Sequence, residues 1–177
     1  MTNLRSTPSQ TVGPYLHIGL IRDECEFAVP PGTPGAVWIT GRIFDGAGTA
    51  IDDAMVETWQ ADAPGSEDEH NDRRGLARSD TRRGRFALYT VVPGPVCDGA
   101  GGLQAPHLDM SVFARGLLHR LVTRVYFPEH ADRHRADPVL ATVPPERRDT
   151  LIAVRDGEGY VFDVHLQGAV ETVFFDV

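Results

Sequence analysis

Apolar residues in this chain recur with a period of two far more often than with the helical period of 3.6. The clearest stretch is 160–167, where an apolar set alternates with a second set of side chains. The first set is Tyr160, Phe162, Val164 and Leu166, and the second is Val161, Asp163, His165 and Gln167. Successive side chains on a strand point to opposite faces, so the alternation predicts a half-buried β-strand.

Several other segments are rich in β-branched and aromatic residues and predict further strands. They are 36–45, 54–62, 85–92, 107–114, 119–127 and, as an edge or closing strand, 170–177. The turn residues 45–48 predict a hairpin or short loop, and Pro93-Gly94-Pro95 stops the strand before it. We expect an all-β sandwich in a single domain of residues 1–177.

The segments between the strands complete this expectation. Residues 1–35 predict an irregular N-terminal arm and loop, and 63–84 is a charged, glycine-punctuated stretch that predicts a long surface loop. Its charged runs, 67–70 and Arg82-Arg83, are interpreted as solvated. One short helix is expected within 144–154, where prolines suit a helix start. Trp38 and Trp59 are expected in the core.

Charge and composition exclude several classes of function. The formal net charge of −8 argues against a nucleic-acid-binding protein, because phosphates need a basic surface. No segment approaches the roughly 20 apolar residues of a membrane span, and no signal peptide is evident. Two distant cysteines, Cys25 and Cys97, favour reduced thiols and a cytoplasmic protein. An acidic ligand would need a local cation.

The strand predicted at 107–114 carries the most polar chemistry. Leu108, Met110, Val112 and Ala114 form an apolar face that must turn to the core. The other face holds His107, Asp109, Ser111, Phe113 and, just past the strand, Arg115. A face of that kind is either solvated or part of a site.

These motifs resemble those of the intradiol ring-cleaving dioxygenases. The order strand, Pro93-Gly94-Pro95, loop, Pro106-His107 and strand is shared with that family. Segments 7–20, 56–65, 105–116 and 168–177 resemble one branch, the α chains of members that act on protocatechuate. The resemblance covers nearly the whole chain and implies the β-sandwich of that family.

The iron-bearing chains of the family hold a ferric ion with two tyrosines and a His-x-His pair. Val96 stands where a tyrosine should follow Pro95, and Asp109 replaces the second histidine, although His107 is retained. No tyrosine lies between Tyr15 and Tyr89, so the upstream ligand is missing too. Gln104 stands where those chains carry an arginine. The resemblance therefore implies that this chain binds no metal.

The resemblance also implies a shared active site. In the similar enzymes a β chain holds Fe(III), and αβ units assemble further. They cleave 3,4-dihydroxybenzoate with O2 to 3-carboxy-cis,cis-muconate, a step of aromatic catabolism. The α chain forms one wall of the pocket, so Gly13, Pro14, Tyr15 and Arg115 are expected to bind substrate, with no catalytic residue on this chain. An always-charged guanidinium suits the substrate carboxylate, and a tyrosine ring suits an aromatic wall.

Other interpretations stay open at this point. Arg115 could pair with an acidic residue at a subunit interface, Tyr15 could anchor the arm by packing, and His107 with Asp109 could be the relic of a duplicated metal site. At the level of function, the chain could be a non-catalytic scaffold subunit. It could also be a self-sufficient metalloenzyme that uses His107, Asp109 and a tyrosine from elsewhere.

Overall fold

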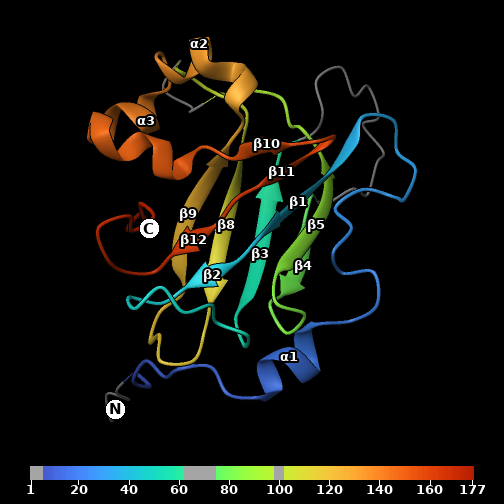
Figure 1. Cartoon of the computed structure of the whole chain (residues 1–177), viewed down its shortest axis with the longest axis vertical. Helices are drawn as coiled ribbons and strands as arrows, with labels where there is room; N and C mark the ends of the chain where they lie inside the picture. The colour runs from blue at the N-terminus through green and yellow to red at the C-terminus, as the bar shows by residue number, and fades with distance from the viewer. Residues whose placement is uncertain (1–5, 62–74, 98–101) are drawn as a thin grey trace, which may run out of the picture.

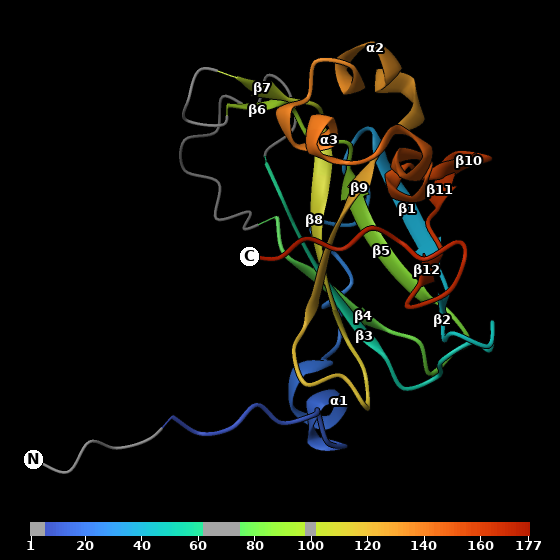
Figure 2. The same ribbon diagram turned by 90° about the vertical axis from the view of Figure 1, so that its left-hand side faces the viewer.

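The computed structural model describes residues 6–61, 75–97 and 102–177 and shows two four-stranded sheets packed face to face (Figures 1 and 2). One sheet has the order β10 (Val154–Asp156), β11 (Gly159–Val161), β1 (Ala36–Gly41) and β5 (Phe86–Val91). The other has the order β4 (Ala77–Asp80), β3 (Met55–Gln60), β8 (His107–Phe113) and β9 (Leu121–Tyr126). The predicted all-β sandwich is confirmed.

Two small sheets and several short helices complete the fold. The small sheets pair β2 (Ile43–Phe44) with β12 (Val164–His165), and β6 (Val96–Cys97) with β7 (Leu103–Gln104). Helix α1 (Tyr15–Leu20) lies at one end of the sandwich. Figure 1 shows the helical segments at the other end: η1 (Pro128–His130), α2 (Ala131–His134), α3 (Pro138–Thr142) and η2 (Pro145–Leu151). No helix in the described ranges is long and apolar enough to cross a membrane.

The core lies between the two sheets, and β8 contributes to it as its alternation predicts. Leu108, Met110, Val112 and Ala114 are fully buried. They meet residues of the facing sheet such as Ile39 in one cluster. Strand β8 pairs with β3 on one side and with β9 on the other, both antiparallel. A central strand of this kind fixes the positions of the residues at both of its ends.

Asp137 joins the helical end to the sheet. The residue is fully buried, and its Oδ1 accepts hydrogen bonds from the backbone N–H groups of Val139 and Leu140, which caps α3. Its Oδ2 accepts a third bond from Ala105 N at 2.7 Å. One carboxylate therefore holds α3 against the segment that leads into β8.

The prediction at 160–167 is right about the buried face and wrong about a single strand. Tyr160, Phe162 and Val164 are buried, but the chain forms β11 and β12 with a break between them. At the break, Asp163 Oδ1 accepts a hydrogen bond from Arg42 N at 2.8 Å, and Arg42 lies in the matching break between β1 and β2. The Asp163 carboxylate thus accepts a backbone hydrogen bond at a point where the parallel ladder is interrupted.

Other predictions need correction. The surface loop expected at 63–84 contains edge strand β4, which pairs with β3 and carries charged residues, as edge strands often do. Residues 62–74, including the acidic run 67–70, lie outside the described ranges. The closing strand at 170–177 is reduced to one bridge between Phe175 and Val122. The N-terminal arm includes α1, and the helix expected at 144–154 is a 3-10 helix accompanied by three further helical segments.

The two tryptophans are not core residues. Trp38 is 40% exposed and Trp59 is 50% exposed, because both point away from the space between the sheets. Trp38 instead packs on the outer face of its sheet against Tyr89 and Phe27, with ring centroids 5.0 and 5.6 Å away. Aromatic residues in strands serve either face, and the sequence does not show which one.

Candidate functional site

A pocket of about 390 Å³ lies where α1 meets the far end of β8. It brings together three of the four residues that sequence reasoning assigned to substrate binding: Gly13, Pro14 and Arg115. Their neighbours in the lining are Val12, His17, Ile18, Asp53 and Arg82. Sequence reasoning missed this second group. In the sequence, Arg82 stands out only as half of the Arg82-Arg83 pair, a pattern that predicts solvated surface charge.

Two hydrogen bonds hold the N-terminal arm in place. Gly116 N donates to Thr11 Oγ1 at 2.7 Å, which ties the arm to the turn that follows β8. Gly116 has a φ of +93°, a left-handed conformation that glycine adopts without strain. Leu16 N donates to Gly13 O at 3.1 Å and begins α1 directly after Pro14. The arm and Arg115 therefore keep a fixed relation.

Each of the two arginines that line this pocket is paired with an aspartate. Arg115 Nε lies 3.2 Å from Asp53 Oδ2, and the Arg115 side chain is 77% exposed. Arg82 Nε donates to Asp80 Oδ2 at 2.6 Å. Arg115 thus has an acidic partner within this chain, whereas the alternative interpretation of the sequence places that partner at a subunit interface. An exposed ion pair of this kind contributes little free energy, so the guanidinium can turn to a ligand carboxylate at small cost.

Tyr15 does not line the pocket. Its side chain is 79% exposed at the start of α1, and Ile18 on the same helix is 72% exposed. No residue of α1 is buried. Tyr15 therefore does not anchor the arm by packing within this chain, and its ring is left free to contact a neighbouring molecule.

The positions that match metal ligands in the family lie elsewhere. His107 begins β8, Asp109 is two residues further along, and Val96 belongs to β6. Arg115 is eight residues beyond His107, so roughly 25 Å of extended chain separates them. The polar face predicted for 107–115 is thus divided between the two ends of the strand, and only its Arg115 end belongs to the pocket.

A guanidinium lies at the centre of the His107 end. Arg124 Nε is 3.0 Å from Asp109 Oδ1, and its NH1 donates to Gln104 Oε1 at 2.9 Å. Tyr126 OH is 3.4 Å from the same nitrogen and 3.5 Å from Asp137 Oδ1. Arg124 thus supplies a positive charge among the oxygens of this cluster.

His107 has too few partners in this setting to hold a metal, since no group of three or more His, Cys, Asp or Glu residues gathers in the described ranges. The residue is buried, and its Nδ1 lies 2.7 Å from the Ala105 carbonyl, which can only accept. Burial, with the Arg124 charge as a smaller cause, lowers the pKa of His107. The neutral ring donates through Nδ1, so its Nε2, 3.7 Å from Asp109, makes no ion pair.

The Tyr126 hydroxyl has a cationic neighbour, because it lies 3.4 Å from Arg124 NH1. Burial raises the pKa of Tyr126 to about 12, so it keeps its proton at neutral pH. Val96 has no donor atom. Within the described ranges, no group of three or more His, Cys, Asp or Glu residues is arranged to hold a metal. The residues at the family's ligand positions therefore do not fit a ferric ion.

The comparisons with known proteins show the family of the chain. A family model described as dioxygenase matches residues 18–168. The α chain of protocatechuate 3,4-dioxygenase from Burkholderia cepacia is 41% identical, with all of both chains covered. The β chain from the same organism is 31% identical, with 90% of this chain and 75% of that one covered.

Solved structures agree on the fold. The dioxygenase domain of a dioxygenase and carbohydrate-binding protein fusion from Streptomyces sp. SirexAA-E has a TM-score of 0.55 at 24% identity. The match covers 96% of this chain and all of that one. At that identity the likeness concerns the fold alone.

Proposed function

This chain belongs to the intradiol dioxygenase family, in the branch of protocatechuate 3,4-dioxygenase α chains, and from that premise we propose that it is an iron-free subunit that completes an active site on a partner. The reaction is cleavage of 3,4-dihydroxybenzoate by O2 to 3-carboxy-cis,cis-muconate. Fe(III) and its ligands belong to the β chain, as does the redox chemistry. A β chain at 31% identity to this one supports a partner of the same fold.

The observation that carries the proposal is the contrast between the two ends of β8. At one end, Arg124 contacts Asp109, Gln104 and Tyr126, and the described residues there include no set of three or more ligands for a metal. At the other end, Arg115 and the arm residues Gly13 and Pro14 line one exposed pocket. A chain of this design can present groups to a substrate but has no ferric centre of its own.

In the proposed site, Arg115 attracts and orients the substrate carboxylate. A guanidinium matches a carboxylate with two parallel hydrogen bonds, and it provides a local positive charge on a chain with a net charge of −8. Gly13 and Pro14 allow the arm backbone to approach the ring closely. Tyr15 extends the wall from the exposed side of α1.

The N-terminal helix supports a partner at this surface. Helix α1 buries none of its six residues against its own chain. Its exposed Tyr15 and Ile18 are large apolar side chains that a second subunit can cover. We infer that the β chain docks over α1, which places the pocket at the αβ interface, and that αβ units assemble further.

The test is Arg115→Ala in the αβ enzyme. We expect KM for protocatechuate to rise about tenfold, because a charge-assisted hydrogen bond to the carboxylate is lost. The control is Arg135→Ala, which removes another exposed arginine, paired to Asp132 and remote from this pocket. The control should leave KM unchanged.

The same experiment separates the alternatives. If Arg115→Ala leaves both kcat and KM unchanged, the proposed role of Arg115 is wrong. A scaffold subunit would show changes in assembly alone, measured by gel filtration of the Arg115→Ala and Tyr15→Ala enzymes. A self-sufficient metalloenzyme would turn over substrate without any β chain.

A further inference from the structure

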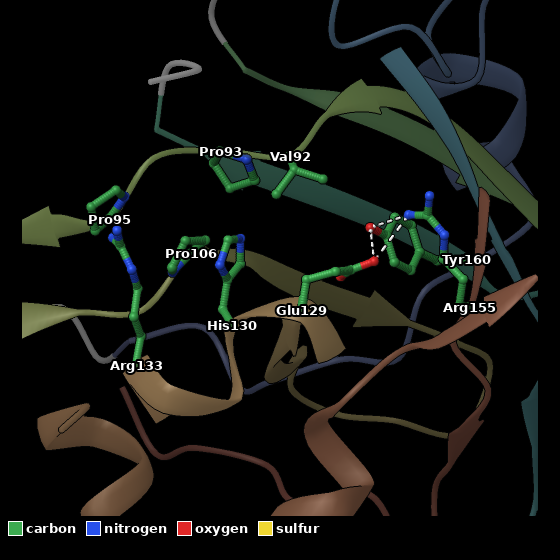
Figure 3. Close-up of a pocket in the computed structure, with 9 residues that line it drawn as sticks. All are labelled: Val92, Pro93, Pro95, Pro106, Glu129, His130, Arg133, Arg155 and Tyr160. Carbon is green, nitrogen blue, oxygen red and sulfur yellow. Dashed lines mark hydrogen bonds and ion pairs between the residues drawn. The ribbon is translucent and has the colours of Figure 1, made fainter. Parts of the chain in front are cut away.

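A second pocket, of about 660 Å³, lies at the helical end of the sandwich. Figure 3 shows it between the chain that follows β5, which carries Val92 and Pro93, and the helical segment that carries His130 and Arg133. Its volume is within the range of small-molecule sites. Among the described residues, none lines both this pocket and the one that contains Arg115.

One wall of this pocket is apolar and rigid. It consists of Val92 and the three prolines Pro93, Pro95 and Pro106. Proline rings have no backbone N–H and a fixed φ, so this wall offers flat hydrocarbon with few polar groups. Tyr160 closes one end with its ring. Such a surface suits a planar apolar group.

The opposite side carries charge, and much of it is already neutralised. Glu129 Oε1 accepts hydrogen bonds from Arg155 NH1 at 3.0 Å and from Tyr160 OH at 2.9 Å. Figure 3 shows the Glu129 side chain turned towards these two groups. The Arg155 guanidinium also lies 4.8 Å from the centre of the Tyr160 ring. The carboxylate is therefore satisfied at that end of the pocket.

Arg133 remains as the uncompensated cation. Among the described residues no carboxylate forms an ion pair with its side chain. Figure 3 shows it extending from α2 towards Pro95. The charges of Glu129 and Arg155 cancel, so Arg133 leaves the lining with a net charge of +1 when His130 is neutral. A local positive charge on a chain of −8 marks a place for an anion.

We propose that this pocket binds a small aromatic carboxylate, with the ring against the proline wall and the carboxylate on Arg133. An aromatic acid combines the flat apolar body and the single negative charge that the two sides of the pocket present. The helical end lies opposite to α1 (Figures 1 and 2), so this binding does not depend on the function proposed for Arg115.

The experiment is calorimetric titration of the full-length chain with benzoate, benzamide and acetate. Benzoate should bind, whereas benzamide lacks the charge and acetate lacks the ring, so each should bind at least about tenfold more weakly. Arg133→Ala should weaken benzoate binding by about the same factor. Arg135→Ala, a matched loss of charge two residues away, should not weaken it, because Arg135 does not line the pocket.

A variant that should gain affinity provides a second test. Glu129→Gln removes the one carboxylate among the described lining residues and leaves Arg155 free for an anion, so benzoate should bind severalfold more tightly. A variant that merely damaged the fold would not gain affinity. The proposal is overturned if benzoate binds no better than benzamide, or if Arg133→Ala and Glu129→Gln both leave its affinity unchanged. Loss of binding in Arg115→Ala alone would assign the benzoate to the other pocket.

Discussion

Arg124 lies beside Asp109 and Gln104, two positions that the family resemblance relates to the metal site of the iron-bearing chains. Its guanidinium is close to Asp109, Gln104 and Tyr126 through contacts of 2.9 to 3.4 Å. A fixed positive charge repels a second cation and satisfies the same oxygens. In the part of the chain that the structure describes, metal ligands are therefore too few, and the Arg124 guanidinium pairs with the oxygens of Asp109 and Gln104.

The raised pKa of Tyr126 gives a prediction for alkaline pH. In the unfolded chain this tyrosine titrates near 10, and in the folded chain its pKa is about 12. Below pH 10 both states are protonated and the group has no effect. Above pH 10 only the unfolded chain ionises, so the free energy of unfolding should fall by about 2 kcal/mol as pH rises to 12.

Urea denaturation at several pH values measures this loss. In Tyr126→Phe, the free energy of unfolding should change less between pH 10 and 12 than in the unmodified protein. Tyr15→Phe, at an exposed position, should keep the original pH dependence. An unchanged slope in Tyr126→Phe would show that another group causes the alkaline loss.

Single residues also show where sequence reasoning stops. Comparison with the family motif is enough to single out Val96, His107 and Asp109 from the sequence. The Arg124 contacts could not be foreseen, because they depend on the register of β8 against β9, which sets Asp109 opposite Arg124. Arg82 was missed for the same reason: its place beside α1 depends on how the arm folds back.

At the scale of elements, Gly41 shows how closely the end of β1 packs against the segment that contains Phe162. A Cβ atom at this position would lie 1.9 Å from the Phe162 carbonyl oxygen and 2.6 Å from the Phe86 ring. The segment that contains Phe162 comes close to the end of β1 here, because Phe162 N donates a hydrogen bond to Thr40 O at 2.8 Å. Only a residue without a side chain allows this approach.

Gly41→Ala should therefore lower the free energy of unfolding by about 3 kcal/mol or more, since backbone on one side must move. Gly19→Ala is the control, because nothing lies within 4 Å of a Cβ added there. The control should be neutral or slightly stabilising in urea denaturation. Equal stability of the two variants would contradict the close packing at Gly41.

The strands that could be foreseen are those whose apolar alternation faces one core. This holds for 36–45, 54–62, 85–92, 107–114 and 119–127, each of which contains a strand in the structure. Strand β4 was missed because an edge strand keeps charged residues such as Arg78, which forms an ion pair with Glu57 on β3. The segment 170–177 was overpredicted, since its apolar residues pack without a continuous ladder.

At the scale of the whole molecule, the sandwich separates two kinds of surface. The α1 end presents Arg115, the arm and exposed apolar side chains, and it is the end that we assign to the partner and the substrate. The helical end holds the filled His107 cluster and the proline-walled pocket. In the function that we propose, the chain contributes to catalysis through the groups that its α1 end presents to another subunit.

The most direct test of this account is to purify the chain alone and together with its β chain, and to measure iron content and protocatechuate-dependent O2 uptake. The account predicts a colourless, inactive chain and an iron-loaded, active pair. Stoichiometric iron and ring cleavage by the lone chain would contradict it, because the Arg124 cluster could then not be what fills the metal position.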